Sequence, residues 1–125
     1  MPLIAGIQGE SSLLVEYADT AVAQRSGEVP VLATPRLVAL FEEAAIDALS
    51  GQLNENQTSV GMRVQIDHLA PSGIGSTIRA RATLQAVEGR RLTFTAVATE
   101  LDNVIANATI TRVIVNTKQF LERLA

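Results

Sequence analysis

The sequence predicts an α+β domain in which a curved antiparallel sheet wraps around one long central helix. An apolar segment between residues 34 and 51 carries both a helix-start and a helix-stop signal. Four segments of alternating apolar and polar residues follow it, and short turn sequences join the last three. One buried helix against a meander of strands forms two layers around one core. The 125 residues suffice for one such core but not for two, so we expect a single domain over residues 1–125.

The N-terminal third is expected to contain one strand and one loop. The segment LLVEY, residues 13–17, is predicted to be the first strand, because such aliphatic and aromatic residues favour extended structure. Residues 19–30 are predicted to form a polar loop, because Ser26, Gly27 and Pro30 interrupt regular structure.

The central helix is expected to begin at Thr34 and Pro35. Thr34 is a favourable N-cap, and Pro35 suits the first helical position, where its missing N–H costs no hydrogen bond. The helix should continue through Leu49 and end near Ser50 and Gly51, because glycine is common directly after a helix. Apolar residues cover most of its circumference, so we expect burial on several sides.

Four strands are expected after the helix, over residues 59–68, 76–87, 90–101 and 104–115. Alternation should place one set of side chains of each strand on the core side. In the second strand this set is Ser76, Ile78, Ala80, Ala82, Leu84 and Ala86. Glu88-Gly89 and Asp102-Asn103 suit two-residue hairpin loops, so the last three strands should form an antiparallel meander. An amphipathic helical turn over residues 118–124 is expected to close the domain.

The only histidine, His68, ends the first of these four strands on its apolar side. Alternation predicts one inward row that comprises Val60, Met62, Val64, Ile66 and His68. An imidazole at this place is either structural, hydrogen-bonded to a backbone carbonyl, or part of a pocket where it changes protonation near neutral pH. Position alone favours the structural interpretation.

Glu42 differs from the two other acids of the predicted helix. Glu43 and Asp47 belong to the polar stripe of the helix, so we expect them to be solvated. Glu42 lies on an aliphatic stripe, together with Val38, Ala45, Ile46 and Leu49. A carboxylate in such surroundings needs a partner or a function. Thr34 lies two turns earlier on roughly the same side, so the two side chains either line one groove or act only as an N-cap and a boundary residue.

Arg112 repeats this pattern in the last strand. It shares its phase with Val104, Ala106, Ala108, Ile110 and Ile114. An inward arginine either pairs with an acid, such as Glu42 or one from a dimer partner, or meets an anionic or carbonyl ligand, and the ion pair is the favoured interpretation. Gly61 marks either a bulge or a close approach of a ligand to the backbone. Periodicity thus directs four polar side chains inward, those of Thr34, Glu42, His68 and Arg112.

Composition argues against several classes of function. The net charge of −3 and the isoelectric point near 5.1 disfavour a nucleic-acid or anionic-membrane surface. With no cysteine and one histidine, neither a thiol nucleophile nor a metal site is expected. No nucleotide-binding or nucleophile-elbow pattern is present, so no cofactor is expected. Since the N-terminus lacks a basic signal-peptide region and no apolar run is long enough to cross a membrane, we expect a cytoplasmic protein.

Several ordered motifs occur between residues 29 and 121. They are VLAT at 31–34, Glu42 eight residues after the threonine, SVG at 59–61, His68, AP at 70–71, VEGRRL at 87–92 and TRVIV at 111–115. With these motifs the sequence resembles the hotdog-fold acyl-CoA thioesterases, in particular the branch typified by fluoroacetyl-CoA thioesterase. The resemblance implies a hotdog fold and hydrolysis of a small acyl-CoA to a carboxylic acid and free CoA.

The resemblance also implies roles for individual residues. It places the catalytic threonine, glutamate and histidine on Thr34, Glu42 and His68, and a substrate-binding glycine and arginine on Gly61 and Arg112. Glu42 would act as nucleophile or as base toward water, His68 as general acid/base, and Thr34 as an orienting group. Backbone N–H groups at the start of the helix, with that of Gly61, would stabilise the oxyanion.

Two further expectations concern assembly and substrate. Hotdog proteins are dimers with sites at the subunit interface, and the long edge strands independently favour a homodimer with an extended sheet. The fluoroacetyl-specific enzyme carries lid phenylalanines before its V-x-A-T segment, whereas residues 25–30 here contain no aromatic residue. The alternative function is a non-catalytic hotdog domain that binds an acyl-CoA ligand. The set of Thr34, Glu42 and His68 favours catalysis, because a binder would not need an acid and a base together.

Overall fold

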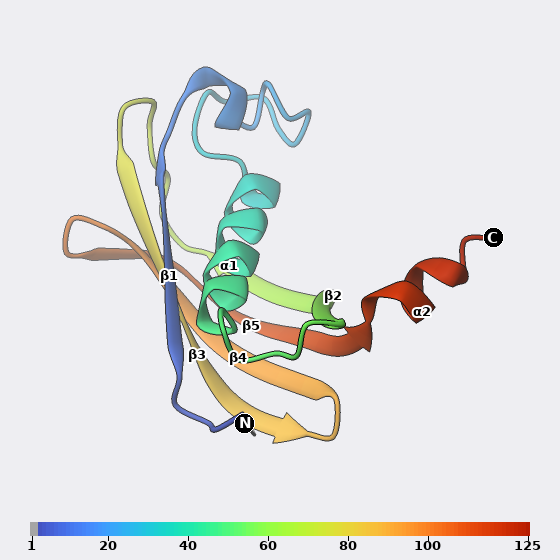
Figure 1. Ribbon diagram of the computed structural model, residues 1–125. Coiled ribbons are helices and arrows are strands. Elements are labelled where there is room, and N and C mark those ends of the chain that lie inside the picture. Colours follow the sequence, from blue (N-terminus) through green and yellow to red (C-terminus); the bar gives the residue numbers. More distant parts are fainter. Residues whose placement is uncertain (1–2) are drawn as a thin grey trace.

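The computed structural model describes residues 3–125, in which a curved sheet of five antiparallel strands surrounds a long helix (Figure 1). The elements in chain order are β1 (Gln8–Leu14), η1 (Tyr17–Asp19), α1 (Thr34–Ala48), β2 (Gln57–His68), β3 (Thr77–Glu88), β4 (Arg91–Glu100), β5 (Asn103–Asn116) and α2 (Thr117–Glu122). The strand order is β1-β3-β4-β5-β2, so β1 and β2 are the two edges of the sheet. The predicted α+β architecture, with one helix on the concave face, is confirmed.

The four later strands lie within two residues of their predicted bounds, but the first strand does not. β1 covers Gln8–Leu14 instead of 13–17, and Tyr17 begins the 3-10 helix η1. β1 pairs with β3 along its whole length, from Gln8 opposite Thr83 to Leu14 opposite Thr77. The strand was missed because its residues are largely polar and it is held by backbone pairing with a distant segment, which leaves no apolar alternation to detect.

The core lies between α1 and the concave face of the sheet. The predicted inward row of β3 is confirmed, since Ile78, Ala80, Ala82 and Leu84 are buried. Ala86 is only half-buried, because a register shift follows Leu84. Buried residues on α1 are Leu37, Leu40, Phe41, Ala44, Ala45 and Ala48. The alanines of the sheet leave room for these larger side chains, so the helix packs closely against it.

Strand β1 is fastened to α1 by contacts that the helical pattern alone did not suggest. A Cβ atom at Gly9 would collide with the backbone of Ala44 and Ala48, so glycine permits the close approach. The Glu10 N–H donates to Asp47 Oδ2 at 2.8 Å, and the Ser11 hydroxyl donates to the Leu40 carbonyl at 2.7 Å. The predicted solvent exposure of Asp47 is confirmed, and its carboxylate also accepts this hydrogen bond from β1.

A bulge in β2 changes which residues of this strand face the core. Its register against β5 shifts between Gly61 and Arg63, and this shift makes Met62 the extra residue. Directly opposed residues of an antiparallel pair point to the same face. The buried residues of β5 lie directly opposite five residues of β2, which therefore face the core. These are Ser59, Gly61, Val64, Ile66 and His68. The predicted row is thus confirmed after the bulge but wrong before it, since Val60 and Met62 face outward.

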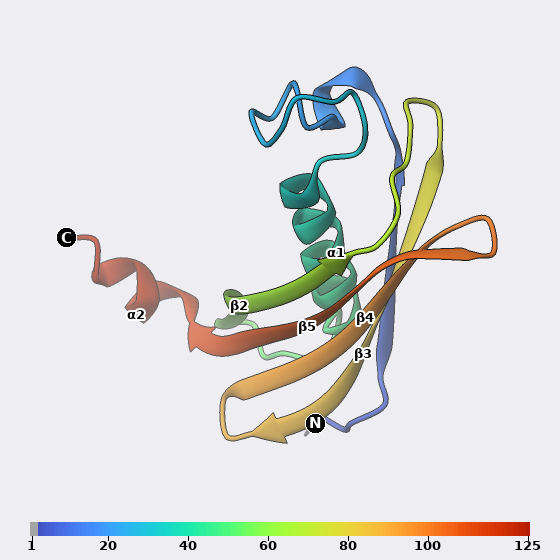
Figure 2. The same cartoon turned by 180° about the vertical axis from the view of Figure 1, so that it is seen from behind.

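Smaller differences concern turns and ends. The two hairpin loops are Gly89-Arg90 and Leu101-Asp102, each one residue away from the predicted pair, because the residues before and after them still pair. In β5 the predicted phase holds from Ala106 onward, while Val104 is exposed. The terminal helix α2 projects away from the sheet, as Figure 2 shows from behind. None of the helices within residues 3–125 is long and apolar enough to cross a membrane.

Candidate active site

Thr34 and His68 meet where α1 begins and β2 ends. Thr34 is the first residue of α1, and Ala33 occupies the cap position without a side-chain cap. The predicted N-cap role of Thr34 is therefore wrong. Because its hydroxyl is not used for capping, it reaches the histidine, with 2.9 Å between Thr34 Oγ1 and His68 Nδ1.

The second ring nitrogen of His68 is available for chemistry. Nε2 is buried and has no hydrogen-bond partner among the described residues. Burial lowers the pKa of His68 below its usual 6.5, and the backbone of Ala70 opposes this shift only in part. The imidazole is thus mainly neutral at pH 7. Thr34 engages one nitrogen and leaves the other to accept or donate a proton.

Glu42 and Arg112 form the second pair of the site. Arg112 NH1 donates to Glu42 Oε2 at 3.0 Å, which confirms the predicted ion pair. The arginine side chain is 6% exposed and the glutamate side chain 31%, so the carboxylate faces the open side of the pair. Burial lowers the pKa of Arg112, while the charge of Glu42 and its hydrogen bond oppose this shift. Arginine has so high a pKa that it nevertheless keeps its charge.

Gly61 lies against this pair. It is directly opposite Arg112 in the β2–β5 ladder, and a Cβ atom here would collide with Glu42 Oε2. The bulge expected at Gly61 is present. The group that approaches its backbone closely is the carboxylate of Glu42, and the missing side chain of Gly61 leaves the space in which this carboxylate lies.

Ser59 is a member of the site that periodicity placed on the wrong face. Arg112 Nε donates to the Ser59 hydroxyl at 2.8 Å, and Arg112 NH2 donates to the Ser59 carbonyl at 3.0 Å. In the sequence, only Gly61, two residues after Ser59, indicated the bulge, because glycine inside a strand often occurs at a β-bulge.

The five predicted site residues thus form two groups where α1 meets β2. Thr34 and Glu42 lie two turns apart on α1, and the β2 residues that face them are His68 and Gly61. Within residues 3–125 no hydrogen bond joins the Thr34–His68 pair to the Glu42–Arg112 pair. Thr34 and Gly61 are exposed, so solvent reaches both groups in a single chain.

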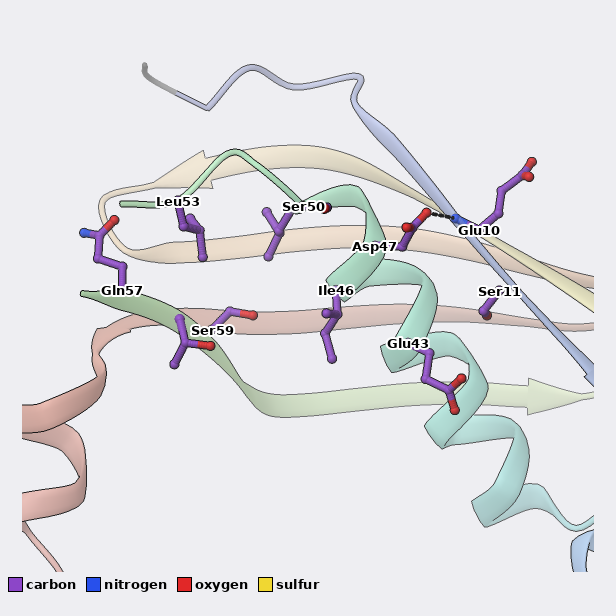
Figure 3. A pocket seen from close by; sticks show the side chains of 11 residues that line it. Glu10, Ser11, Glu43, Ile46, Asp47, Ser50, Leu53, Gln57 and Ser59 are labelled. Atoms are coloured by element: carbon purple, nitrogen blue, oxygen red, sulfur yellow. Dashed lines mark hydrogen bonds between the residues drawn. The ribbon is translucent and has the colours of Figure 1, made fainter. Parts of the chain in front are cut away.

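Two pockets adjoin the contact between α1 and β2. The first, of about 340 Å³, adjoins Thr34 and His68 and is otherwise lined mainly by small or aliphatic residues, including Gly27, Val29 and Val31. The second, of about 570 Å³, lies between the C-terminal half of α1 and the start of β2 (Figure 3). Ile46 and Ser59 project into the space between these two elements. No group of three or more metal-ligating side chains occurs within the described range.

Comparisons with known sequences identify one family. The family described as fluoroacetyl-CoA-specific thioesterase matches residues 15–118. A curated relative, the fluoroacetyl-CoA thioesterase of Streptantibioticus cattleyicolor, is 31% identical over 90 residues. The aligned part is 72% of this chain and 65% of that relative, so the chain spans slightly less than two thirds of its length.

Solved structures agree on the fold. The structure of a fluoroacetyl-CoA thioesterase superposes with a TM-score of 0.92 at 24% identity, covering 99% of this chain and 96% of the other. A thioesterase superfamily member from Thermus thermophilus has a TM-score of 0.89 at 25% identity, with 98% and 93% covered. A hot-dog-like protein from Thermanaerovibrio acidaminovorans has a TM-score of 0.88 at 26% identity, with 96% and 89% covered. These matches confirm the hotdog fold.

Proposed function

Because the chain belongs to the fluoroacetyl-CoA-specific thioesterase family, we propose that it hydrolyses a small acyl-CoA thioester to a carboxylic acid and free CoA. One observation carries the proposal: a carboxylate and an imidazole both lie where α1 meets β2, and each is held by its own partner. Arg112 holds Glu42 at 3.0 Å, and Thr34 contacts His68 at 2.9 Å. Thioester hydrolysis needs a group that attacks or activates water and a group that moves a proton to the leaving thiolate.

The reaction breaks the C–S bond of the thioester and forms a C–O bond with an oxygen from water. Glu42 acts either as nucleophile, through an acyl-carboxylate intermediate, or as the base that deprotonates water. The proton lost by water reaches the CoA sulfur through His68: the neutral ring accepts it at Nε2, from water or from Glu42, and gives it to the thiolate, while Thr34 fixes the ring through Nδ1. Backbone N–H groups at the start of α1 stabilise the developing oxyanion, where one such donor contributes about 2.7–4 kcal/mol.

Rapid acid quench during turnover separates the two roles of Glu42. If Glu42 is the nucleophile, the acyl-carboxylate intermediate adds the mass of the acyl group to the peptide that contains Glu42. If it is the base, this peptide keeps its unmodified mass at every quench time. Fragment-ion mass spectrometry assigns any added mass to Glu42 or to the adjacent Glu43, which is the internal control.

We propose that the acyl group is small and aliphatic and that fluorine is not specifically recognised. From residues 26–31, the pocket beside His68 is lined by Ser26, Gly27, Val29 and Val31, and by no aromatic ring. We expect the ratio of kcat/KM for fluoroacetyl-CoA and acetyl-CoA to match the ratio of their rates with hydroxide. A much larger enzymatic preference for the fluorinated substrate would contradict this assignment.

Hydrolysis of an acyl-CoA panel tests the activity, with the released thiol followed spectroscopically. The wild type should release thiol, and Glu42→Gln and His68→Ala should be strongly impaired. Glu43→Gln is the matched control, since this neighbouring acid pairs with Arg36 on the polar side of the helix. Full activity in both site variants would exclude the mechanism. Saturable thermal stabilisation by an acyl-CoA without thiol release would identify a non-catalytic binding domain instead.

We also propose that two copies pair along β2 to form a homodimer with the active sites at the subunit interface. β2 is an edge strand with twelve residues, and long unpaired edges tend to pair with another strand. On α1, Ile46 is 51% exposed beside the half-buried Val38 and Glu42, so an apolar strip flanks this edge. Analytical ultracentrifugation tests the proposal, and a fully active monomer would contradict it.

We propose a cytoplasmic location for this activity. CoA carries charged phosphates, and charged groups enter a bilayer only at high cost, so the enzyme must share a compartment with its substrate. Cell fractionation with antibody detection tests this, and recovery of the protein only outside the cytoplasm would contradict it.

A further inference from the structure

Arg112 is the most buried charged group of the site, and all three of its nitrogens are hydrogen-bonded. NH1 donates to Glu42 Oε2 at 3.0 Å. The other two nitrogens donate to a single residue, Nε to the Ser59 hydroxyl at 2.8 Å and NH2 to the Ser59 carbonyl at 3.0 Å. With the arginine side chain 6% exposed, water has little access to replace any of these bonds.

The β2 bulge puts Ser59 in this position. Before the register shift at Gly61, the inward residues of β2 are the odd-numbered ones, so Ser59 faces the core opposite Ile114. Without the extra residue Met62, the alternation set by His68 would turn Ser59 outward. Figure 3 shows Ser59 near the start of β2, on the strand that lies beside α1.

We propose that Ser59 is a positioning residue of the active site, which acts on Glu42 through Arg112. A guanidinium is planar and rigid, so fixing its Nε and NH2 fixes the direction in which NH1 points. NH1 is directed at Glu42 Oε2, and this bond leaves the other carboxylate oxygen free for the reaction. Glu42 is 31% exposed on a flexible stem, so its orientation depends on this single cation.

Kinetics of Ser59 variants test the inference, which for this readout rests on the proposed thioesterase function. Ser59→Ala removes the hydroxyl but keeps the carbonyl, and we expect kcat to fall about 10- to 100-fold, because small displacements of a reacting group have effects of this size. KM should change by less than about twofold, and Ser59→Thr, which restores a hydroxyl, should recover most of kcat. In an Arg112→Lys background, Ser59→Ala should cause little further loss.

Ser76→Ala is the matched control, since it removes a similar bond, from the Ser76 hydroxyl to Glu100 at 2.9 Å, and neither residue contacts Arg112 or Glu42. It should keep the wild-type kcat. Thermal unfolding confirms that each variant is folded. The inference is overturned if Ser59→Ala keeps the wild-type kcat, if only KM changes, or if Ser59→Thr is impaired as strongly as Ser59→Ala.

A second measurement needs no activity. The Nε–H of Arg112 should give a slowly exchanging NMR signal in the wild type, because it is buried and hydrogen-bonded. We expect faster exchange in Ser59→Ala, and wild-type exchange in Ser59→Thr and Ser76→Ala. If the wild type hydrolyses no thioester, the proposed function fails, and this comparison alone decides whether Ser59 holds Arg112. Unchanged exchange in Ser59→Ala would refute the inference.

Discussion

Four side chains of the candidate site form two pairs, and the partners in each pair come from different parts of the chain. Glu42 from α1 meets Arg112 from β5, and Thr34 from α1 meets His68 from β2. Pairing of this kind allows polar side chains to lie in a largely aliphatic domain, because a buried charge or donor without a partner lowers the stability of the fold. The same contacts fix the direction of each group, so stability and reactivity are coupled here.

This coupling predicts a stability effect for Glu42→Gln in addition to its effect on activity. The change keeps the shape but leaves the buried guanidinium of Arg112 facing a neutral amide. We expect the free energy of unfolding to fall by about 1–3 kcal/mol, as for a buried hydrogen-bonding group that loses its charged partner. Urea unfolding measures this. Glu43→Gln, whose partner Arg36 lies nearer the surface, should cost less than about 1 kcal/mol, and equal losses would contradict the argument.

The lowered pKa of His68 predicts a particular pH dependence. Burial disfavours the imidazolium, so the neutral ring persists to a lower pH than in a model peptide, whose pKa is 6.5. A profile of kcat/KM between about pH 5 and 8 should therefore have an acid limb with its midpoint below 6.5. A flat profile, or a limb above 6.5, would contradict the role of His68 as the group that accepts the proton.

The same shift has a consequence for folding. Below pH 6.5 the unfolded chain binds a proton at His68 more readily than the folded chain does. The contribution of His68 is therefore fully present above the unfolded pKa and decreases as the pH falls through this window. Relative to a His68→Asn variant, the wild type should lose stability as the pH drops below 6.5, as urea unfolding at several pH values would show.

Among the elements, α1 and β1 are joined by backbone contact as well as by side chains. Gly9 lets the strand approach the helix, and two hydrogen bonds from neighbouring residues of β1 reach Asp47 and the Leu40 carbonyl. The helix therefore has a fixed position along the sheet, and with it the positions of Thr34 and Glu42 relative to β2.

Gly9→Ala tests this contact. The added methyl group would collide with the backbone of Ala44 and Ala48, and backbone atoms cannot move aside as a flexible side chain can. We expect a loss of about 1–3 kcal/mol in the free energy of unfolding, the usual cost of overpacking. Gly73→Ala is the control, because a Cβ atom there meets no atom within 4 Å. Similar stability of the two variants would show that β1 and α1 do not depend on this contact.

The β2 strand shows how one residue changes an entire site. The bulge at Met62 reverses the phase of the strand, so Ser59 and Gly61 join the buried face together with Val64 and His68. Periodicity correctly predicted His68, because it lies on the same side of the bulge as most of the apolar residues. It failed for Ser59, because the bulge depends on the pairing of β2 with β5. In the sequence only Gly61 indicates it, and a glycine is weak evidence for a bulge.

For the whole molecule, the solvent-exposed site and the long edge strand β2 predict that activity depends on the pairing of two copies of the chain. In the proposed dimer, β2 carries Gly61 and His68 next to the pairing edge, so dissociation would expose and loosen both. We expect the specific activity to fall when the enzyme is diluted below its dimer dissociation constant and to recover on concentration. Fluorescence-detected sedimentation at the assay concentrations measures the oligomeric state, and constant specific activity across the monomer–dimer transition would contradict the prediction.

Local sequence was enough to predict the central helix, the four long strands and the inward direction of Glu42, His68 and Arg112. These features depend on periodicity and on signals within a few residues, such as Pro35 at the helix start. The family motifs added the hotdog fold and the candidate residues. Other features depend on segments that are far apart in the chain and meet only in the folded protein. They are the position of β1, the bulge in β2, the contact of Thr34 with His68 in place of a capping bond, and the hydrogen bonds between Arg112 and Ser59. Each is stabilised by a contact between residues that are distant in the chain. The local pattern of apolar and polar residues does not depend on such contacts and therefore cannot predict them.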